Sequence, residues 1–319
     1  MTTADASKQF SEQDIPDMAS KIAIVTGGTS GIGYAIALQL AKAGANVIIT
    51  ARNDEKGQKS VADIKTELGA AAKISYSIMN NEDLFSVESF ARSFGEVHET
   101  LDILVNNAGI GMPPWRSING IESQIMVNYL SHFHLTNLLL PKLRKAGELH
   151  GDARIVNVSS VGHRYAKPSS LNPNVPGWEE ANDEATYESN VNYGFSKLGQ
   201  IHQATVLTKQ LGSTSNVRIN SCHPGSIRTN IAGPDKVISG SVGHSIAKYL
   251  NSHGASSDWG ALTPLYLATS PEIVDNDIRG KYFVPIAVEE EPTPLAKSEE
   301  GAIWTWAWSE AAVARLLQQ

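Results

Sequence analysis

The sequence is poor in cysteine and in long apolar stretches. Its 319 residues include one cysteine, Cys222, so no disulfide can form within the chain, which favours a reducing compartment. No apolar run approaches the roughly 20 residues that span a bilayer. The polar first twenty residues lack the apolar core of a secretory signal. We therefore expect a cytoplasmic protein without a membrane span.

The sequence also has no excess of basic residues. The 26 Lys and Arg residues are outnumbered by 33 Asp and Glu residues, and the net charge of −7 argues against nucleic acid as a partner. The nine histidines show neither the spacing of a zinc protease nor a pairing with cysteines, so we predict no metal site. These absences leave a small molecule as the expected partner.

Short apolar runs alternate with helix-like segments along most of the chain. The runs cover 22–25, 47–50, 74–78, 101–105, 154–158, 217–221 and 281–285, and the helix-like segments lie near 32–43, 54–68, 82–97, 119–146, 190–211 and 257–270. Alternation at this spacing is typical of right-handed βαβ units. We predict an α/β fold with a single doubly wound parallel sheet, a Rossmann fold, and helices on both faces.

No internal repeat or low-complexity linker divides the chain. We expect a flexible leader over 1–20 and one domain over 21–319. The segments 161–189 and 226–260 depart from the alternation, as does the tail beyond 286. Ligands bind at loops on the carboxyl edge of such a sheet, so we expect these two insertions to face the substrate. The alternative for 161–189 is a solvated surface loop.

A glycine-rich turn follows the first apolar run. Residues 26–33 read Thr-Gly-Gly-Thr-Ser-Gly-Ile-Gly and precede a segment with helical periodicity. A strand, a glycine turn and a helix form the context of a dinucleotide fingerprint. Glycines allow close approach to a pyrophosphate, and the helix N-terminus attracts its charge. The alternative is a turn that only packs a helix on a sheet.

A tyrosine and a lysine stand four positions apart at Tyr193 and Lys197. On a helix this spacing places both side chains on one face. A cation beside a phenol lowers the phenol's pKa from its usual value of about 10, so Tyr193 can exchange a proton near neutral pH. The alternative is an ordinary surface pair.

Four further motifs lie between the glycine turn and residue 229. They are Leu-Asp-Ile-Leu-Val-Asn-Asn-Ala-Gly at 101–109, Asn128 in a helical segment, Val-Ser-Ser at 158–160, and His-Pro-Gly-Ser-Ile-Arg-Thr at 223–229. With the glycine turn and the Tyr193–Lys197 pair, they resemble the short-chain dehydrogenase/reductase family from about Lys21 to Pro285. Asn-Gly-Ile-Glu at 119–122 and Gly-Lys-Tyr-Phe at 280–283 resemble its retinol-dehydrogenase-like branch, which includes soluble fungal reductases.

The resemblance implies four catalytic residues: Asn128, Ser160, Tyr193 and Lys197. Tyr193 would act as the general acid/base, and Ser160 would orient the substrate oxygen. Ser160 is preferred over Ser159 because the second serine of the pair matches the family motif. Lys197 would also bind the nicotinamide ribose, and Asn128 would hold a water that links Lys197 to solvent.

The resemblance also implies a nicotinamide cofactor. NAD-preferring members usually carry an acid at the end of the second strand, where this chain has Ala51 followed by Arg52. A guanidinium binds a 2′-phosphate bidentately, so we predict NADP(H). The expected cofactor-binding residues are Gly27, Thr29, Ser30, Gly31, Ile32, Gly33, Arg52, Asn53, Asn80, Asn107, Ala108, Gly109, Tyr193, Lys197, Pro224, Gly225, Ile227 and Thr229.

The sequence therefore predicts an NADP(H)-dependent oxidoreductase. It would transfer hydride between nicotinamide and the carbonyl or secondary alcohol of a medium-sized hydrophobic substrate, such as a lipid or a secondary metabolite. The alternatives are a redox-silent NADP-binding protein and a cyclase or isomerase on the same fold. Family members are commonly dimers or tetramers, so a homo-oligomer is one option, although the tail and loop extensions could block those surfaces.

Three tryptophans alternate near the C-terminus, at 304, 306 and 308. On a helix they would spread over about 200°, so they cannot all line one pocket. We favour packing in the core or at an interface.

Overall fold

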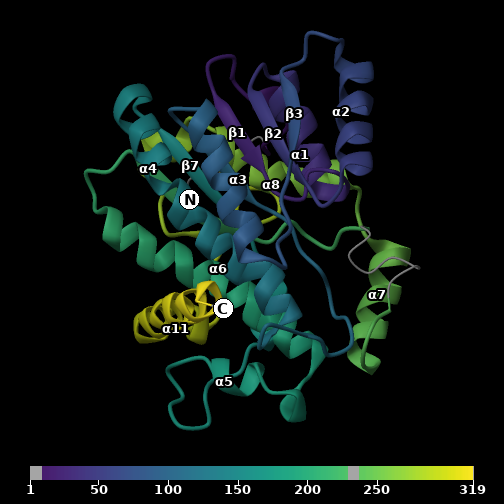
Figure 1. Cartoon of the computed structure of the whole chain (residues 1–319), viewed down its shortest axis with the longest axis vertical. Coiled ribbons are helices and arrows are strands. Elements are labelled where there is room, and N and C mark those ends of the chain that lie inside the picture. The colour runs from purple at the N-terminus through teal and green to yellow at the C-terminus, as the bar shows by residue number, and fades with distance from the viewer. Residues whose placement is uncertain (1–8, 229–236, 319) are drawn as a thin grey trace, which may run out of the picture.

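The computed structural model describes residues 9–228 and 237–318, which contain an eight-stranded sheet (Figure 1). Its strands are β1 (Ile22–Val25), β2 (Asn46–Ala51), β3 (Ile74–Ile78), β4 (Ile103–Asn106), β7 (Ala153–Val158), β8 (Val217–Cys222), β9 (Tyr282–Val284) and β10 (Val288–Glu289). Their order is β10-β9-β8-β7-β4-β1-β2-β3. Only β10 among them runs antiparallel to its neighbour. A separate hairpin joins β5 (Ser117–Ile118) to β6 (Ile121–Glu122).

The central strands are apolar on both faces because both faces are covered. In β1 and β4, Ile24 lies opposite Leu104 and Val25 lies opposite Val105. Successive side chains of a strand point to opposite faces. Ile24 and Leu104 accordingly belong to one core cluster and Val25 and Val105 to the other. A parallel sheet buried on both faces is the context in which such continuous apolar runs occur.

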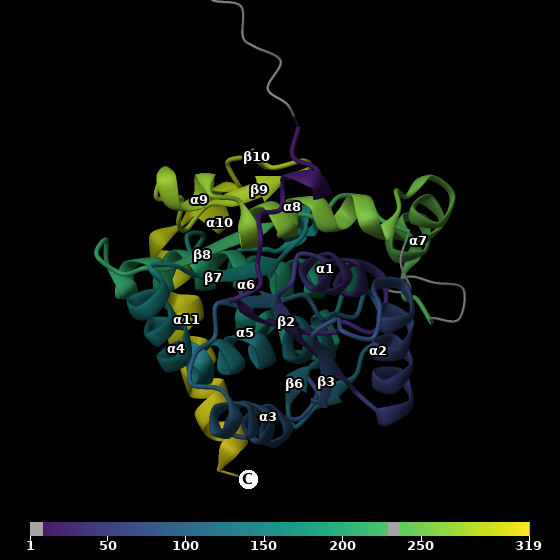
Figure 2. The same ribbon diagram turned by 90° about the horizontal axis from the view of Figure 1, so that it is seen from above.

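Helices form a layer on each face of the sheet. They are α1 (Gly31–Lys42), α2 (Asp54–Leu68), α3 (Leu84–Val97), α4 (Ser131–His150), α5 (Trp178–Ala181), α6 (Ser189–Leu211), α7 (Ser241–His253), α8 (Ser257–Thr269), α9 (Glu272–Asp275), α10 (Pro294–Lys297) and α11 (Glu299–Leu317). Helices α1 and α8 share one core cluster, and α3, α4, α6 and α11 share the other. Figure 2 shows α8 and α3 on opposite sides of the sheet. No helix in the described parts of the chain is long and apolar enough to cross a membrane.

Shorter helical segments complete the fold. They are the 3₁₀ segments η1 (Glu12–Asp14), η3 (Val161–Tyr165) and η4 (Glu184–Thr186), and the π-helix η2 (Ile125–Leu130), which leads directly into α4.

The fold predicted from the sequence is confirmed. Each of the seven predicted apolar runs overlaps a strand of the sheet, with ends that differ by at most two residues. Helices α7 and α11 lie in stretches that the alternation did not cover. Neither helix is part of a βαβ unit. The alternation of strands and helices therefore could not predict them.

The described part of the predicted leader packs on the domain. The Phe10 ring contacts Tyr266 of α8 edge to face, with the ring centres 5.5 Å apart. Met18 is 5% exposed, and its N–H donates to the carbonyl of Ala43 at the end of α1. From Phe10 onward, this segment therefore adds apolar contacts to the core beneath α1 and α8.

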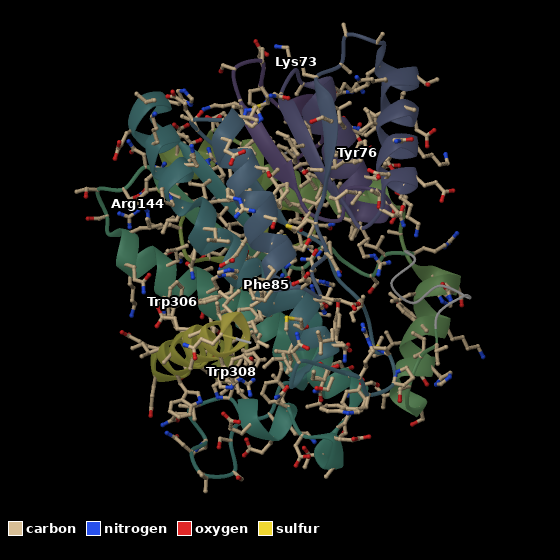
Figure 3. All side chains as sticks on the ribbon, viewed as in Figure 1. Lys73, Tyr76, Phe85, Arg144, Trp306 and Trp308 are labelled. Carbon is tan, nitrogen blue, oxygen red and sulfur yellow. The ribbon has the colours of Figure 1, made fainter. Side chains whose placement is uncertain are left out.

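Helix α11 lies along the face of α6 and holds part of the 161–189 insertion in place. Trp178 of the insertion is 1% exposed, and its indole N–H donates to Thr305 at 2.9 Å. Its ring stacks on Trp308 with centres 4.8 Å apart, while Trp306 meets Phe133 of α4 edge to face. Figure 3 shows Trp306 and Trp308 on α11. The predicted angular spread of the tryptophans is observed, since Trp304 is 49% exposed.

Candidate active site

The glycine turn joins the loops that follow β1 and β4. Gly27 and Gly31 have φ angles of 64° and 58°, a region that favours glycine. The Thr26 hydroxyl accepts the N–H groups of Asn107 and Ala108, each at 2.9 Å. A Cβ on Gly33 would lie 2.4 Å from the Asn107 side chain. Gly33 therefore permits close packing of α1 against the second loop.

The N-terminus of α1 is open to a ligand. Ser30 is the N-cap residue, and its side chain makes no capping hydrogen bond. The N–H groups of the first helical turn and the positive end of the helix dipole therefore face the loop side of the sheet. Such a terminus binds phosphate, so the residues present fit a dinucleotide pyrophosphate.

The end of β2 offers a cation, Arg52, where no acid follows the strand directly. Arg52 is exposed directly after the strand. Asn53, which we expected to contact the cofactor, caps α2 by accepting the Lys56 N–H at 3.0 Å. The next carboxylate, Asp54, accepts the hydroxyl of Tyr76 at 3.1 Å. Arg52 is thus the group at this edge suited to an added phosphate.

Asn80 and its neighbours form the turn after β3. The Asn80 amide oxygen accepts the Glu82 N–H at 3.1 Å. Glu82 forms a two-pronged ion pair with Arg116, with distances of 2.6 and 2.8 Å, and this pair holds the pKa of Glu82 below its usual range. The positive charge of Arg52 also reaches Glu82. Asn80, which we expected to contact the cofactor, therefore lies in a fixed polar turn.

The two serines at the end of β7 have different partners. Ser159 is buried, and its hydroxyl donates to the carbonyl of Lys197 at 2.7 Å. The Ser160 oxygen accepts the Gly162 N–H at 3.0 Å, and its hydroxyl lies close enough to the Tyr193 phenol to lower the pKa of that phenol. Gly162 allows this approach, because a Cβ there would lie 2.9 Å from the Tyr193 ring. Ser159 anchors α6, and Ser160 is the serine that meets the phenol.

Tyr193 and Lys197 lie one turn apart on α6. The Lys197 ammonium is 5.6 Å from the centre of the Tyr193 ring, and it donates to the Val158 carbonyl at 2.8 Å. Burial lowers the pKa of Lys197 to about 7. Burial raises the pKa of Tyr193 above its usual value, and the hydrogen bond from Ser160 opposes that rise. This differs from the lowered tyrosine pKa that we expected, because burial outweighs the attraction between the two groups.

Asn128 lies in the π-helix and connects three segments. Its amide oxygen accepts the Ile110 N–H at 2.8 Å, and its amide nitrogen donates to the Ile110 carbonyl and the Ser196 hydroxyl, each at 3.0 Å. The backbone carbonyl of Asn128 accepts from His132 and from Gln200. Asn128 therefore fixes the loop after β4 against α6.

The 223–229 motif follows β8. Gly225 has a φ angle of 99°, and a Cβ there would lie 2.3 Å from the Trp259 ring. Ile227 is 4% exposed and pairs with Ala255 through an isolated bridge. Pro224 lies between β8 and this turn. Thr229, which we expected to contact the nicotinamide, lies outside the described residues.

The loop after β4, the residues just before α7 and the 161–189 insertion meet around Met112. The Met112 N–H donates to the Gln124 amide oxygen at 2.8 Å, and the Met112 carbonyl accepts the Ser239 N–H at 2.9 Å. The Tyr187 hydroxyl donates to the carbonyl of Pro113, next to Met112. The Trp115 ring packs edge to face on Tyr187 with centres 5.3 Å apart. These contacts hold the loop after β4, the residues before α7 and the 161–189 insertion together.

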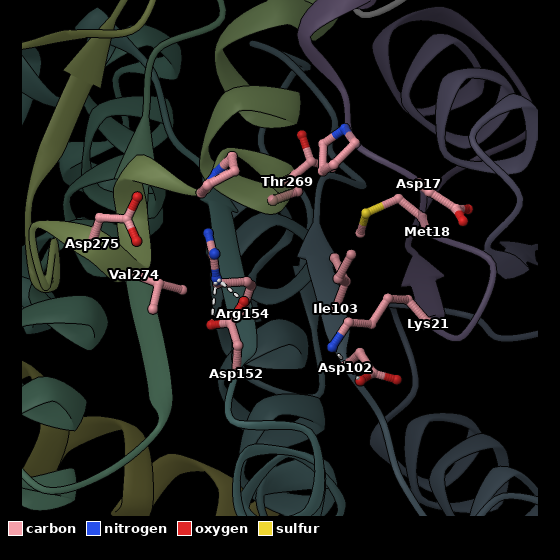
Figure 4. A pocket seen from close by; sticks show the side chains of 13 residues that line it. Asp17, Met18, Lys21, Asp102, Ile103, Asp152, Arg154, Thr269, Val274 and Asp275 are labelled. Carbon is pink, nitrogen blue, oxygen red and sulfur yellow. Dashed lines mark hydrogen bonds and ion pairs between the residues drawn. The ribbon is translucent and has the colours of Figure 1, made fainter.

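A hollow of about 220 Å³ lies at the amino ends of the strands, away from these groups (Figure 4). Four of its charged side chains form two ion pairs. Lys21 pairs with Asp102 at 3.2 Å, and Arg154 pairs with Asp152 at 2.6 Å. Across 9–228 and 237–318, no group of three or more His, Cys, Asp or Glu side chains is placed to hold a metal ion. The hollow is therefore bounded by ion pairs that brace strand ends.

Sequence reasoning missed two polar residues that support the site. Glu122 is fully buried, which raises its pKa, and its carboxylate accepts the N–H groups of Gln124 and Ile125 at the start of the π-helix. Gln200 touches both Lys197 and the Asn128 carbonyl. Gln200 follows Lys197 by three residues on a helix, and this spacing could have predicted that the two side chains are neighbours.

The chain is similar in sequence and in structure to dehydrogenases and other oxidoreductases. Residues 21–171 match the family model described as short chain dehydrogenase. A Schizosaccharomyces pombe protein named as an uncharacterized oxidoreductase is 40% identical over 86% of this chain and 79% of its own length. Human retinol dehydrogenase 13 is 34% identical over 91% of this chain and 83% of its own. The solved Pseudomonas aeruginosa RhlG/NADP active-site complex has a TM-score of 0.61 and 25% identity, covering 85% of this chain and 96% of that one.

Proposed function

This chain belongs to the short-chain dehydrogenase family, and we propose that it is an NADP(H)-dependent oxidoreductase for the carbonyl or secondary alcohol of a medium-sized hydrophobic substrate. One observation carries the proposal: the hydroxyls of Ser160 and Tyr193 meet beside the buried ammonium of Lys197. The three groups come from the end of β7 and from α6, at the carboxyl edge of the sheet where such folds bind ligands.

Reduction of a carbonyl creates an alkoxide, which needs a hydrogen-bond donor and a proton. The Gly162 N–H donates to the Ser160 oxygen, and we propose that the Ser160 proton turns from the phenol to the substrate oxygen when a substrate binds. Tyr193 gives its phenolic proton to the same oxygen. The Lys197 ammonium stabilises the phenolate that remains. When bound, the nicotinamide supplies or accepts the hydride.

The proposed cofactor contacts follow from the loops at this edge. The turn from Gly27 to Gly33 and the first turn of α1 would hold the pyrophosphate, and Asn107 to Gly109 would line the adenosine side. Exposed Arg52 would bind a 2′-phosphate, since Asp54 is bonded to Tyr76 and Glu82 is paired with Arg116. The name of the Pseudomonas aeruginosa complex, which includes NADP, supports this choice of cofactor.

The proposed substrate class rests on the walls of the site. The partly exposed rings of Trp115 and Tyr187 would supply apolar surface from two segments, and the buried Met112, between them and Ser239, ties in the residues just before α7. A hydrophobic ketone, aldehyde or secondary alcohol suits such walls. A lipid or a secondary metabolite has this chemistry, and reduction is the proposed direction because cells usually keep the NADPH pool reduced.

The test is NADPH consumption with a panel of hydrophobic ketones and aldehydes, measured beside NADPH binding by fluorescence. The proposal predicts binding, and consumption that depends on a carbonyl substrate. Binding without consumption across the panel would identify a redox-silent protein. Conversion of a substrate to an isomer without loss of NADPH would identify a cyclase or isomerase.

A further inference from the structure

The side chain of Gln200 forms a bridge between Lys197 and Asn128. Gln200 is fully buried in α6. Its amide oxygen accepts from the Lys197 ammonium at 3.3 Å, and its amide nitrogen donates to the Asn128 carbonyl at 3.0 Å. One amide thus uses both its acceptor and its donor to join the lysine to the π-helix.

The bridge depends on a close approach between α6 and the π-helix. A Cβ on Gly199 would lie 2.7 Å from the ring of Tyr129, so a larger residue there would push the two segments apart. The Gln200 backbone is fixed as well, because its carbonyl accepts from the side chains of Asn157 at 2.9 Å and Ser221 at 3.1 Å. Strands β7 and β8 therefore hold Gln200 in place.

The Asn128 carbonyl is fully engaged by two side chains. His132 donates to it at 2.9 Å, and Gln200 donates at 3.0 Å. Burial lowers the pKa of His132 to about 4, so the ring is neutral, and its other nitrogen lies 2.8 Å from the Thr26 hydroxyl. A carbonyl oxygen has two lone pairs. The protein's own groups therefore occupy the place that we expected a bridging water to take.

We propose that Gln200 is a positioning residue that holds the charged form of Lys197 in place through its amide oxygen, in the role expected of a water on Asn128. The proposal rests on the function proposed above for Lys197. An amide accepts at oxygen and donates at nitrogen, so it passes no proton without changing tautomer. Gln200 therefore positions the Lys197 ammonium and does not itself relay a proton.

The other titratable groups around Lys197 do not stabilise its charged form. They are Tyr193 on α6, His132 on α4, Cys222 on β8 and His223 after β8. Burial lowers the pKa of both histidines to about 4 and raises the pKa of the Cys222 thiol and the Tyr193 phenol. All four are therefore neutral near pH 7. Stabilisation of the ammonium comes from the Val158 carbonyl and the Gln200 amide oxygen.

The first test measures the titration of Lys197 directly, in full-length protein without substrate. Lysines carrying ¹³C at the ε carbon are followed by NMR against pH, and Lys197→Met assigns the signal. We expect the midpoint for Lys197 to fall by about one pH unit in Gln200→Leu and to rise by about one unit in Gln200→Glu. The matched control is Gln203→Leu, because Gln203 is buried on the same helix and bonds to Asn157 rather than to Lys197. It should leave the midpoint unchanged.

The second test follows kcat/KM against pH in the NADPH-loaded enzyme. One limb of the pH profile of kcat/KM reports loss of the Lys197 proton. The midpoint of this limb should move to lower pH in Gln200→Leu and to higher pH in Gln200→Glu. It should not move in Gln203→Leu. An unchanged Lys197 midpoint in Gln200→Glu would overturn the proposal, and this variant decides the question even if Gln200→Leu does not fold. If wild type binds NADPH but never consumes it, the proposed function fails, while the NMR titration still decides the role of Gln200.

Discussion

The ammonium of Lys197 lies 5.6 Å from the centre of the Tyr193 ring, and the two side chains leave α6 one turn apart. Burial moves their pKa values apart: the pKa of Lys197 falls to about 7 and that of Tyr193 rises above its usual value. Burial thus favours the neutral form of each group, which makes the contacts around Lys197 decisive for its charge.

The lowered pKa of Lys197 predicts a specific dependence of stability on pH. Between about pH 7 and 10.5 the folded protein binds fewer protons at this site than the unfolded chain, so the free energy of unfolding rises with pH. The cost of the buried ammonium, on the order of 5 kcal/mol, is fully present below pH 7 and is relieved as pH approaches 10.5. Lys197→Met removes this contribution.

Denaturant unfolding of wild type and Lys197→Met, near pH 7 and near pH 9.5, measures the effect. Wild type should gain stability relative to the variant as pH rises. Parallel stabilities at both pH values would show that Lys197 keeps its ordinary pKa in the folded protein.

Arg52 should decide between the two nicotinamide cofactors. Arg52→Ala removes the guanidinium proposed to bind the 2′-phosphate, so NADPH should bind at least about tenfold more weakly, a charge-assisted contact of about 1.4 kcal/mol or more. Affinity for NADH should change little. Arg92→Ala, on the exposed face of α3, is the control. Equal losses for both cofactors in Arg52→Ala would rule out a phosphate contact.

The C-terminal tryptophans should differ sharply in their effect on stability. Trp306 is 9% exposed and packs on Phe133, so Trp306→Ala should cost roughly 3 to 5 kcal/mol of unfolding free energy. Trp304 is 49% exposed on the same helix, and Trp304→Ala should cost about 0.5 kcal/mol or less. Chemical denaturation of the two variants compares them directly. Similar losses would mean that α11 does not pack as described.

The fold could be predicted because its signals are local. Apolar runs such as 154–158 and 217–221 mark buried strands, and the glycine turn marks the first crossover. The tail beyond 286 carries no such pattern. Helix α11 is held by contacts with distant residues, such as Trp178 against Trp308, which sequence spacing cannot reveal.

The candidate site could be predicted only where a motif fixes it. The convergence of Ser160, Tyr193 and Lys197 followed from the motifs. The choice of Ser160 over Ser159 gains a physical reason in the bond from Ser159 to the α6 backbone. The raised pKa of Tyr193 could not be foreseen, because burial is not visible in the spacing of residues. The role of Gln200 depends on the contact between Gly199 and Tyr129, which joins two distant segments.

The most direct test of the central claim is the turnover of Tyr193→Phe with NADPH and a carbonyl substrate found in the panel, measured together with NADPH affinity. Loss of the proton donor should reduce turnover at least about a hundredfold, a barrier increase of about 3 kcal/mol, while NADPH affinity stays within about threefold of wild type. Near-normal turnover in Tyr193→Phe would contradict the claim that this phenol transfers the proton.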